Sequence, residues 1–412
     1  MTKFKLLFFV CLFSNFLGHA QQLDTDKLYL QALQEYREAR YSEALELTRK
    51  GLEVAPGYHD IRILQVRTLF ALQKFEVAGK NIELLLTTAP GYEGVKTLAM
   101  QRLYQLEGNE ALNYANHLLE IYGPDPDLKI RTARLFLERG EKNKARELAT
   151  EVYAFRNLDD RQRYALQQLL DLTVTNAVQV TGQYITFSDN YSRSDSWYAV
   201  SVEYQHNFKN LALIGRATYS DRSYNDGSLY EIEAYPILSE KMYAFANIGI
   251  SEGNIFPEYR ASASLFYNFA TSFEAEAGFR SLFYNDNNYF TAIAGLTAYT
   301  GRFYLNARAF VGPERLEQLV QNYQFNVRYY LSTSENYLFG RLGSGISPDE
   351  PTLYTRAQEN PSLEAWYFSA GINKTLGMHH VVSISGGILS EDLPRGETGT
   401  QFTASLGYKY KF

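Results

Sequence analysis

The last eleven residues of the chain alternate strictly between two kinds of side chain. One set is Phe402, Ala404, Leu406, Tyr408, Tyr410 and Phe412, and the set between them is Thr403, Ser405, Gly407, Lys409 and Lys411. Because successive side chains of a strand point to opposite faces, the pattern predicts a β-strand with one aromatic-rich face and one polar face. A strand of this kind is typical of the closing strand of an outer-membrane β-barrel, whose apolar face meets lipid.

The same alternation recurs from Ala177 to the end of the chain. It predicts about fourteen antiparallel strands of near ten residues each, and a short connection at Asn285 to Asn288 leaves twelve as the alternative count. After residue 20, no apolar stretch approaches the roughly 20 residues that a membrane-spanning helix needs. Since hydrocarbon offers no partner for unpaired backbone groups, only a closed barrel could carry this chain through a bilayer.

The connections between the predicted strands alternate in length. Those we assign to the periplasm are short: Lys209 to Asn210, Ser239 to Lys241, Ala270 to Ser272, Thr300 to Arg302, Ser332 to Asn336 and Leu376 to His379. Those we assign to the outside are mostly longer: Ser188 to Ser196, Ser220 to Ser228, Ser251 to Glu258, Gly312 to Gln318, Ile346 to Ser362 and Ser390 to Gly399. Short periplasmic turns and longer outer loops are the usual asymmetry of such barrels.

The charged residues of the strands fall mostly opposite the apolar ones. They are Glu203, Arg216, Glu231, Glu233, Arg260, Glu274, Glu276, Arg280, Arg308, Arg328 and Arg341. An arginine facing lipid at mid-bilayer would cost about 2 to 4 kcal/mol, so we expect these residues to line the lumen. Mixed charges can pair into a ladder that plugs the interior or form a polar track for a solute, and the residues alone leave both readings open. Inward aromatic residues would narrow the lumen: Tyr235, Tyr243, Phe245, Tyr304 and Tyr330.

A helical repeat precedes the strands. Ala55-Pro56-Gly57-Tyr58 recurs 34 residues later as Ala89-Pro90-Gly91-Tyr92, and 34 residues is the tetratricopeptide period. Small residues keep the register, since Ala44 corresponds to Ala78 and Ala111 to Ala145. Stacked repeats of this kind usually present a concave surface to a protein or polymer, so we expect a docking platform; a rigid spacer is the alternative.

The first twenty residues read as a secretory signal peptide. Lys3 and Lys5 precede an apolar run that closes on Gly18-His19-Ala20. The domains we expect are therefore a signal peptide at 1–20, periplasmic tetratricopeptide-like repeats at 21–175 and an outer-membrane β-barrel at 176–412. The single cysteine lies in the signal peptide, which leaves the mature chain without thiol chemistry. A net charge of -6 argues against nucleic acid as a partner.

The chain offers no convincing catalytic or metal site. Its strand region holds only three histidines, His206, His379 and His380, all at predicted periplasmic strand ends or turns. His380 with Ser383 is the best nucleophile and base pair, but a surface histidine is the simpler interpretation because triads are identified by geometry. The adjacent histidines lack a third ligand at useful spacing. We expect a protein that is not an enzyme and has neither cofactor nor metal.

The order of these features resembles a known family. With its signal peptide, 34-residue repeats and tyrosine-rich barrel ending in Leu406-Gly-Tyr-Lys-Tyr-Lys-Phe412, the chain is similar to the YaiO family of outer-membrane β-barrel proteins. The order of helical repeats and then barrel is also similar to the larger exopolysaccharide-export porins. That likeness implies that the repeats dock periplasmic partner proteins and that the barrel passes a polar polymer, such as a polysaccharide.

These inferences give one leading hypothesis and two alternatives. We expect an outer-membrane protein of a Gram-negative bacterium that contacts lipid through its barrel and exports or passes a polar polymer. We expect the barrel-assembly machinery to recognise its closing strand through the membrane-insertion signature Phe402, Leu406, Tyr408, Tyr410 and Phe412. The first alternative is a plugged barrel that serves as a membrane anchor and assembly platform. The second is a barrel enzyme acting on lipid or surface glycan.

Overall fold

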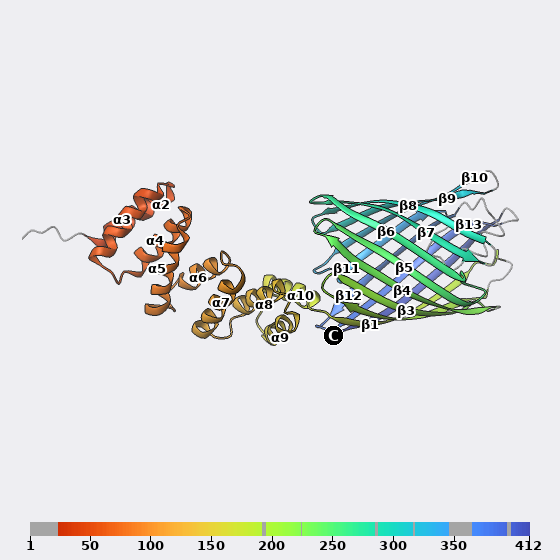
Figure 1. The fold of residues 1–412 in the computed structure, drawn as a ribbon, viewed down its shortest axis with the longest axis horizontal. Coiled ribbons are helices and arrows are strands. Elements are labelled where there is room, and N and C mark those ends of the chain that lie inside the picture. The colour runs from red at the N-terminus through yellow and green to blue at the C-terminus, as the bar shows by residue number, and fades with distance from the viewer. Residues whose placement is uncertain are drawn as a thin grey trace, which may run out of the picture. The chain divides into compact units, whose positions relative to one another are not determined.

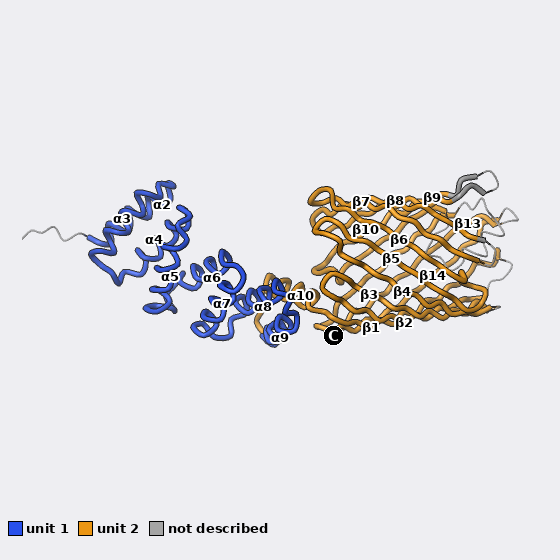
Figure 2. Tube along the Cα trace, in the orientation of Figure 1, with its two compact units in different colours: residues 1–155 blue, residues 156–412 orange. Residues whose placement is uncertain are grey.

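The computed structural model describes residues 24–191, 195–223, 225–284, 287–315, 318–345, 365–393 and 397–412. The predicted signal peptide lies outside these ranges, as does the expected outer loop from Ile346 to Ser362. The chain forms two compact units, residues 1–155 and residues 156–412 (Figure 2). None of the helices in the described ranges has the length and apolar character that a membrane-spanning helix needs.

The first unit is a stack of helix pairs (Figure 1). Its described helices are α2 (Thr25–Arg37), α3 (Tyr41–Val54), α4 (His59–Ala71), α5 (Phe75–Thr88), α6 (Val95–Leu103), α7 (Gly108–Tyr122), α8 (Pro126–Glu138) and α9 (Lys142–Tyr153). The alanines that set the repeat register, Ala44, Ala78, Ala111 and Ala145, are fully buried. Small side chains at these positions let the helices approach closely, so the predicted tetratricopeptide-like solenoid is confirmed.

The turn tyrosine of each Ala-Pro-Gly-Tyr segment links neighbouring repeats. The Tyr58 hydroxyl donates to Asp26 at 2.6 Å, and the Tyr92 hydroxyl donates to Asp60 at 2.9 Å. Both pairs span 32 residues and are offset from each other by one 34-residue repeat. The motif that the sequence marks as a helix end therefore also fastens one repeat to the one before it.

The second unit begins with helix α10 (Asp160–Leu172) and continues into the strands. A capping box starts the helix, because Asp159 accepts from the Gln162 amide while the Gln162 side chain accepts from the Asp159 amide. Strand β1 begins at Asn176, and α10 groups with the strands and not with the repeats.

Fourteen antiparallel strands close into a barrel in which each strand pairs with its sequence neighbour and β1 pairs with β14. The strands are β1 (Asn176–Phe187), β2 (Trp197–Asn207), β3 (Leu211–Asp221), β4 (Asp226–Ser239), β5 (Met242–Gly253), β6 (Tyr259–Ala270), β7 (Phe273–Tyr284), β8 (Asn287–Thr300), β9 (Phe303–Arg315), β10 (Gln318–Tyr330), β11 (Tyr337–Ser344), β12 (Ala365–Leu376), β13 (His380–Asp392) and β14 (Thr398–Lys411). Fourteen strands are thus confirmed, and twelve is excluded.

The strand ends are arranged as the connection lengths predict, but several outer connections are shorter. At one end, which we call the short-turn end, every connection is brief, and the chain enters at β1 and finishes at β14 there (Figure 1). At the other end, several expected loops are shorter than predicted because pairing continues into them. Asp221 pairs with Asp226, Glu314 with Leu319 and Asp392 with Thr398. These segments are polar, so the sequence pattern predicts loops there. Backbone hydrogen bonds between neighbouring strands nevertheless continue into them.

Candidate functional site

The two faces of the barrel wall differ sharply in what they carry. Apolar and aromatic side chains such as Tyr198, Val200 and Val202 are exposed on the outer face, while the charged residues between them are buried or half-buried on the inner face. All eleven charged residues singled out from the sequence are buried or half-buried. Along β14 the exposed residues are Phe402, Leu406, Tyr408, Tyr410 and Phe412, and the covered ones include Lys409 and Lys411.

One group of these charges forms a network around Arg216. Its guanidinium lies 2.7 Å from Glu203, 2.8 Å from Glu233 and 3.5 Å from Glu231. Arg260 reaches the other oxygen of Glu231 at 3.2 Å. Because all five side chains have partners of opposite sign, the inner face of β2 to β6 carries a paired ladder.

A second ion pair joins β7 to β9. Arg308 donates from Nε and Nη2 to the two oxygens of Glu276, at 2.6 and 2.7 Å. This forked arrangement is the strongest form of an arginine–carboxylate contact. Seven of the eleven predicted residues, Glu203, Arg216, Glu231, Glu233, Arg260, Glu276 and Arg308, are therefore in ion pairs with one another.

Glycines on the inner face let these side chains meet across an intervening strand. Gly295 of β8 lies in register between Glu276 and Arg308, and a Cβ there would come within 2.8 Å of the glutamate oxygen. Gly249 of β5 lies in the same way between Glu231 and Arg260. Both glycines sit beneath a side chain that passes over them, which explains why a strand interior tolerates them.

Gly343 repeats the arrangement with an uncharged pair. It lies in register between Gln324 of β10 and Tyr367 of β12, and the amide of Gln324 donates to the Tyr367 hydroxyl at 3.0 Å above it. A Cβ at Gly343 would lie 2.2 Å from the Tyr367 ring. Sequence reasoning missed these three glycines, because their role depends on which residues face each other on three consecutive strands.

A cavity of about 520 Å³ opens on the inner face. Its aromatic lining includes the sequence-predicted Tyr235, Tyr243, Tyr304 and Tyr330, together with Phe266, Tyr299, Tyr337 and Phe339, which the sequence analysis did not single out. The predicted Phe245 packs on Tyr235, with ring centroids 5.2 Å apart. Most of these rings belong to residues near the strand ends at the short-turn end, so the cavity lies in that half of the barrel.

The remaining charges of the cavity are held differently from the paired ladder. Arg328 lies between the rings of Tyr304 and Tyr337, at 5.1 and 4.9 Å from their centroids. Arg341 donates from Nε to the side-chain oxygen of Asn326 at 3.0 Å. Glu274 lies beside the hydroxyls of Tyr243 and Thr297. The last predicted residue, Arg280, is buried on β7 outside this cavity.

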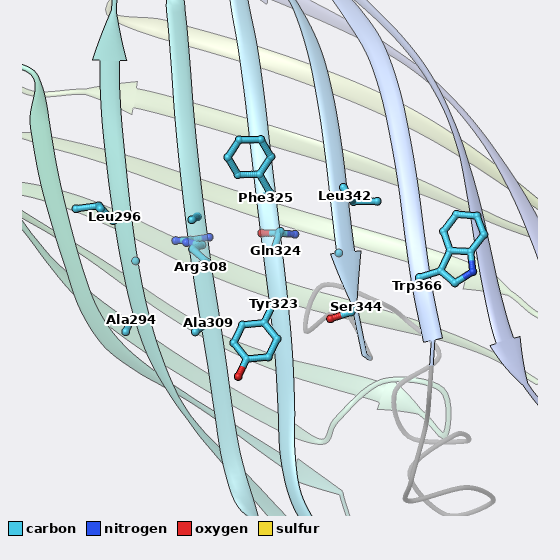
Figure 3. A pocket seen from close by; sticks show the side chains of 13 residues that line it. Ala294, Leu296, Arg308, Ala309, Tyr323, Gln324, Phe325, Leu342, Ser344 and Trp366 are labelled. Carbon is cyan, nitrogen blue, oxygen red and sulfur yellow. The ribbon is translucent and has the colours of Figure 1, made fainter.

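The outer wall carries a larger, mostly apolar hollow of about 720 Å³. Leu296, Tyr323, Phe325, Leu342 and Trp366 surround it, and Figure 3 shows these side chains spread over strands β8 to β12. Its floor is formed by small residues, notably Ala294, Ala307 and Ala309. A hollow of this composition suits acyl chains, whereas polar chemistry is confined to the inner face.

Charges also gather where α10 meets the short-turn end. Lys411, only 2% exposed, reaches Asp171 of α10 at 2.6 Å and Glu335 of the β10–β11 turn at 3.1 Å. Lys409 contacts the same glutamate at 2.6 Å. Burial alone would raise the pKa of Glu335, but the two lysines outweigh it and lower that pKa below its ordinary value.

The histidines make structural contacts. Nδ1 of His380 lies 2.7 Å from the Tyr408 hydroxyl, that of His379 lies 2.6 Å from the Lys411 carbonyl, and that of His206 lies 2.7 Å from Asn176. Ser383, the partner considered for His380, lies on β13 and pairs with Gly407 of β14. Within the described ranges, no three His, Cys, Asp or Glu residues gather as a metal site would require.

Comparison with solved structures finds barrels and a helical repeat protein. The CymD monoaromatic hydrocarbon channel is 9% identical, and the match covers 60% of this chain and 91% of that one with a TM-score of 0.41. The outer membrane protein Omp33 of Acinetobacter baumannii is 13% identical over 58% and 99%, with a TM-score of 0.37. A thermophilic TPR protein of Thermus thermophilus is 21% identical over 36% and 86%, with a TM-score of 0.26. At these values the likenesses carry no conclusion about what this chain binds or conducts.

The sequence comparison is more specific. No curated protein sequence matches the chain. Residues 175–350, which begin next to the first strand and extend beyond β11, match the family described as the YaiO membrane beta barrel domain. Residues 175–350 therefore form a YaiO membrane beta barrel domain, which confirms the resemblance that the repeats, strand pattern and terminal strand together predict.

Proposed function

We propose that this protein passes a polar polymer, of the exopolysaccharide kind, through its barrel without acting as an enzyme. The observation that carries the proposal is the inner cavity of about 520 Å³, where tyrosine rings alternate with arginine, asparagine and glutamine side chains. Tyrosine offers an apolar ring and a hydroxyl, which suits a chain of sugar rings. Because the cavity has its polar groups on the inner face, a solute moving along the lumen would meet them in succession.

The helical repeats would dock a periplasmic protein. Their continuous buried core, which runs through Leu69, Leu85 and Leu118, makes a rigid scaffold of the kind that stacked repeats use to present a binding surface. In this proposal the repeats are periplasmic, the short-turn end faces the periplasm, and the barrel-assembly machinery recognises the exposed aromatic residues of β14.

A plugged barrel that anchors the repeats is the second candidate, and the paired ladder favours it. Arg216 and Arg260 both form ion pairs with Glu231, and paired charges of this kind can fill a lumen without binding a solute. The two candidates differ in one observable: an open lumen conducts ions, and a filled one does not.

Single-channel recording of the full chain in planar bilayers tests the proposal. We expect steady ohmic conductance, and we expect Tyr304→Ala to raise it because this ring narrows the cavity. Tyr323→Ala is the matched control, since Tyr323 lies on the outer wall and its side chain is 53% exposed. Absence of current from the intact, folded protein would remove polymer passage and leave the anchor.

A further inference from the structure

We propose that the inner cavity binds an anionic saccharide unit, with Arg328 and Arg341 holding its carboxylate. The inference rests on the proposed passage of a polar polymer and specifies the chemical class of that polymer as acidic. It follows from the charge balance of the cavity, from the geometry of the two guanidinium groups and from the rings around them.

The cavity has one more cation than anions, and two of its arginines contact no carboxylate. Five ionisable groups other than tyrosines line the cavity: Glu274, Glu276, Arg308, Arg328 and Arg341. Arg308 occupies both oxygens of Glu276, and Glu274 lies beside two hydroxyls. Within the described ranges, Arg328 and Arg341 contact rings and side-chain amide or hydroxyl groups but no carboxylate. A partly desolvated cation without a counter-charge attracts an anion strongly.

The guanidinium of Arg328 keeps its hydrogen-bond donors for a ligand. The rings of Tyr304 and Tyr337, on the strands to either side, hold the cation through their faces and not through a carboxylate, so its N–H groups remain for an anion. The Tyr330 hydroxyl also lies close to this side chain. A planar group held in this way presents paired donors that match the two oxygens of a carboxylate.

Arg341 lies beside Arg328 on the same face. Asn326 is in register with Arg341, and Arg328 is in register with Phe339, so the two arginines are diagonal neighbours on β10 and β11. Arg341 donates from Nε to Asn326, which leaves its two terminal nitrogens for another acceptor, and both arginines line the cavity. An anion between them would relieve the repulsion of two like charges.

The rest of the cavity fits a sugar ring. Its volume of about 520 Å³ falls within the range of roughly 300 to 1,000 Å³ that small-molecule sites occupy. Tyr304, Tyr330 and Tyr337 surround the arginines, and the amides of Asn306 and Gln324 lie among the lining residues. Rings supply faces for stacking on the apolar side of a sugar, while amides and hydroxyls meet its hydroxyl groups.

Equilibrium binding to the folded, detergent-solubilised full chain tests the inference. The probes are a short oligosaccharide of a uronic acid and a neutral oligosaccharide of the same length, titrated by calorimetry at low salt. We expect the acidic probe to bind at least about tenfold more tightly than the neutral one, since a charge-assisted hydrogen bond of about 1.5 kcal/mol corresponds to that factor. Arg328→Gln and Arg341→Gln should each weaken the acidic probe about tenfold and leave the neutral probe unchanged.

Arg260→Gln is the matched control. It removes the same charge from the inner face, but Arg260 does not line the cavity. Equal weakening by this control would reduce the effect to overall charge and overturn the site, as would equal affinity for the two probes or no binding by either. Circular dichroism of each variant confirms folding.

Conductance recordings on the same preparations separate this inference from the proposed function. Current without preference for the acidic probe would retain polymer passage and reject the anionic site. Tight, Arg328-dependent binding without current would retain the site and reject passage.

Discussion

The inner-face glycines show how the absence of one atom, the Cβ, allows an ion pair to form across a strand. At Gly295 the space of the missing Cβ is filled by the Glu276–Arg308 contact, which joins β7 to β9 over β8. Any side chain at this position must separate two groups that are already at hydrogen-bond distance. A residue that sequence alone would class as a weak strand former is therefore required by its neighbours.

Gly295→Ala should thus lower the free energy of unfolding by about 3 kcal/mol, the usual effect of breaking a buried ion pair. Urea titration of the protein in lipid vesicles measures this loss. Gly215→Ala is the control, since a Cβ at Gly215 meets open space. Equal stability of the two variants would mean that the carboxylate and guanidinium can meet without the glycine.

The tyrosine link between repeats gives a second prediction at this scale. The Asp26 carboxylate accepts a hydrogen bond from the Tyr58 hydroxyl and raises the pKa of that hydroxyl to about 12, above its ordinary value of 10.0. A raised folded-state pKa means that the contribution is complete below pH 10 and is lost as the pH rises through 12.

Tyr58→Phe should therefore cost about 1 kcal/mol at pH 8, as a single hydrogen bond does, and the difference from wild type should vanish near pH 12. Thermal unfolding followed by helical circular dichroism tests both parts. Tyr153→Phe, at an exposed tyrosine of the same unit, should change nothing at either pH. If the stability difference between wild type and Tyr58→Phe did not change with pH, the hydrogen bond to Asp26 would not be its cause.

At the scale of elements, the two-residue period of the strands determines which face of the wall each side chain lies on, but not how neighbouring strands align. Alternation along β10 is enough to separate Phe325 from Arg328, because neighbouring side chains of a strand face opposite ways. Whether Glu276 meets Arg308 depends on the alignment of three strands, and the sequence does not state that alignment. The glycine gaps, the contacts of Arg328 with two rings and the contact of α10 with β14 all depend on it.

A buried cation, Lys411, links helix α10 to the barrel. Lys411→Met should cost about 3 kcal/mol, because Asp171 loses its cationic partner and Glu335 loses one of two. Since the Glu335 pKa is lowered, its contribution is present above its ordinary pKa of 4.5 and is lost as the pH falls through the lowered value. Hydrogen exchange should show faster exchange in α10 for Lys411→Met at pH 7 and a smaller difference in acid.

Lys409→Met provides the comparison for that experiment. It removes the same charge from the same strand and also weakens the contact with Glu335, but Lys409 does not touch Asp171. If both variants loosen α10 equally, the helix is held through Glu335 and the direct contact is unimportant.

For the whole molecule, repeat spacing and strand alternation predicted a solenoid followed by a fourteen-stranded barrel, because both patterns are set by local geometry. Neither pattern predicted that α10 belongs to the same compact unit as the strands. Its sequence, Asp160 to Leu172, reads as one more amphipathic helix, whereas the contact that links it to the strands joins Asp171 to Lys411, 240 residues away. Long-range pairs of this kind leave no periodic trace in a sequence.

This division predicts where the chain can be cut. Residues 156–412 should refold in lipid vesicles with the stability and single-channel behaviour of the full chain, because they keep α10 and every strand pair. Residues 174–412 keep all fourteen strands but lose Asp171, so the buried amine of Lys411 retains only Glu335, and stability should fall by about 3 kcal/mol. Urea titration compares the two fragments, and Lys411→Met should narrow the gap between them. Equal stability of the unmodified fragments would show that α10 contributes nothing to the barrel.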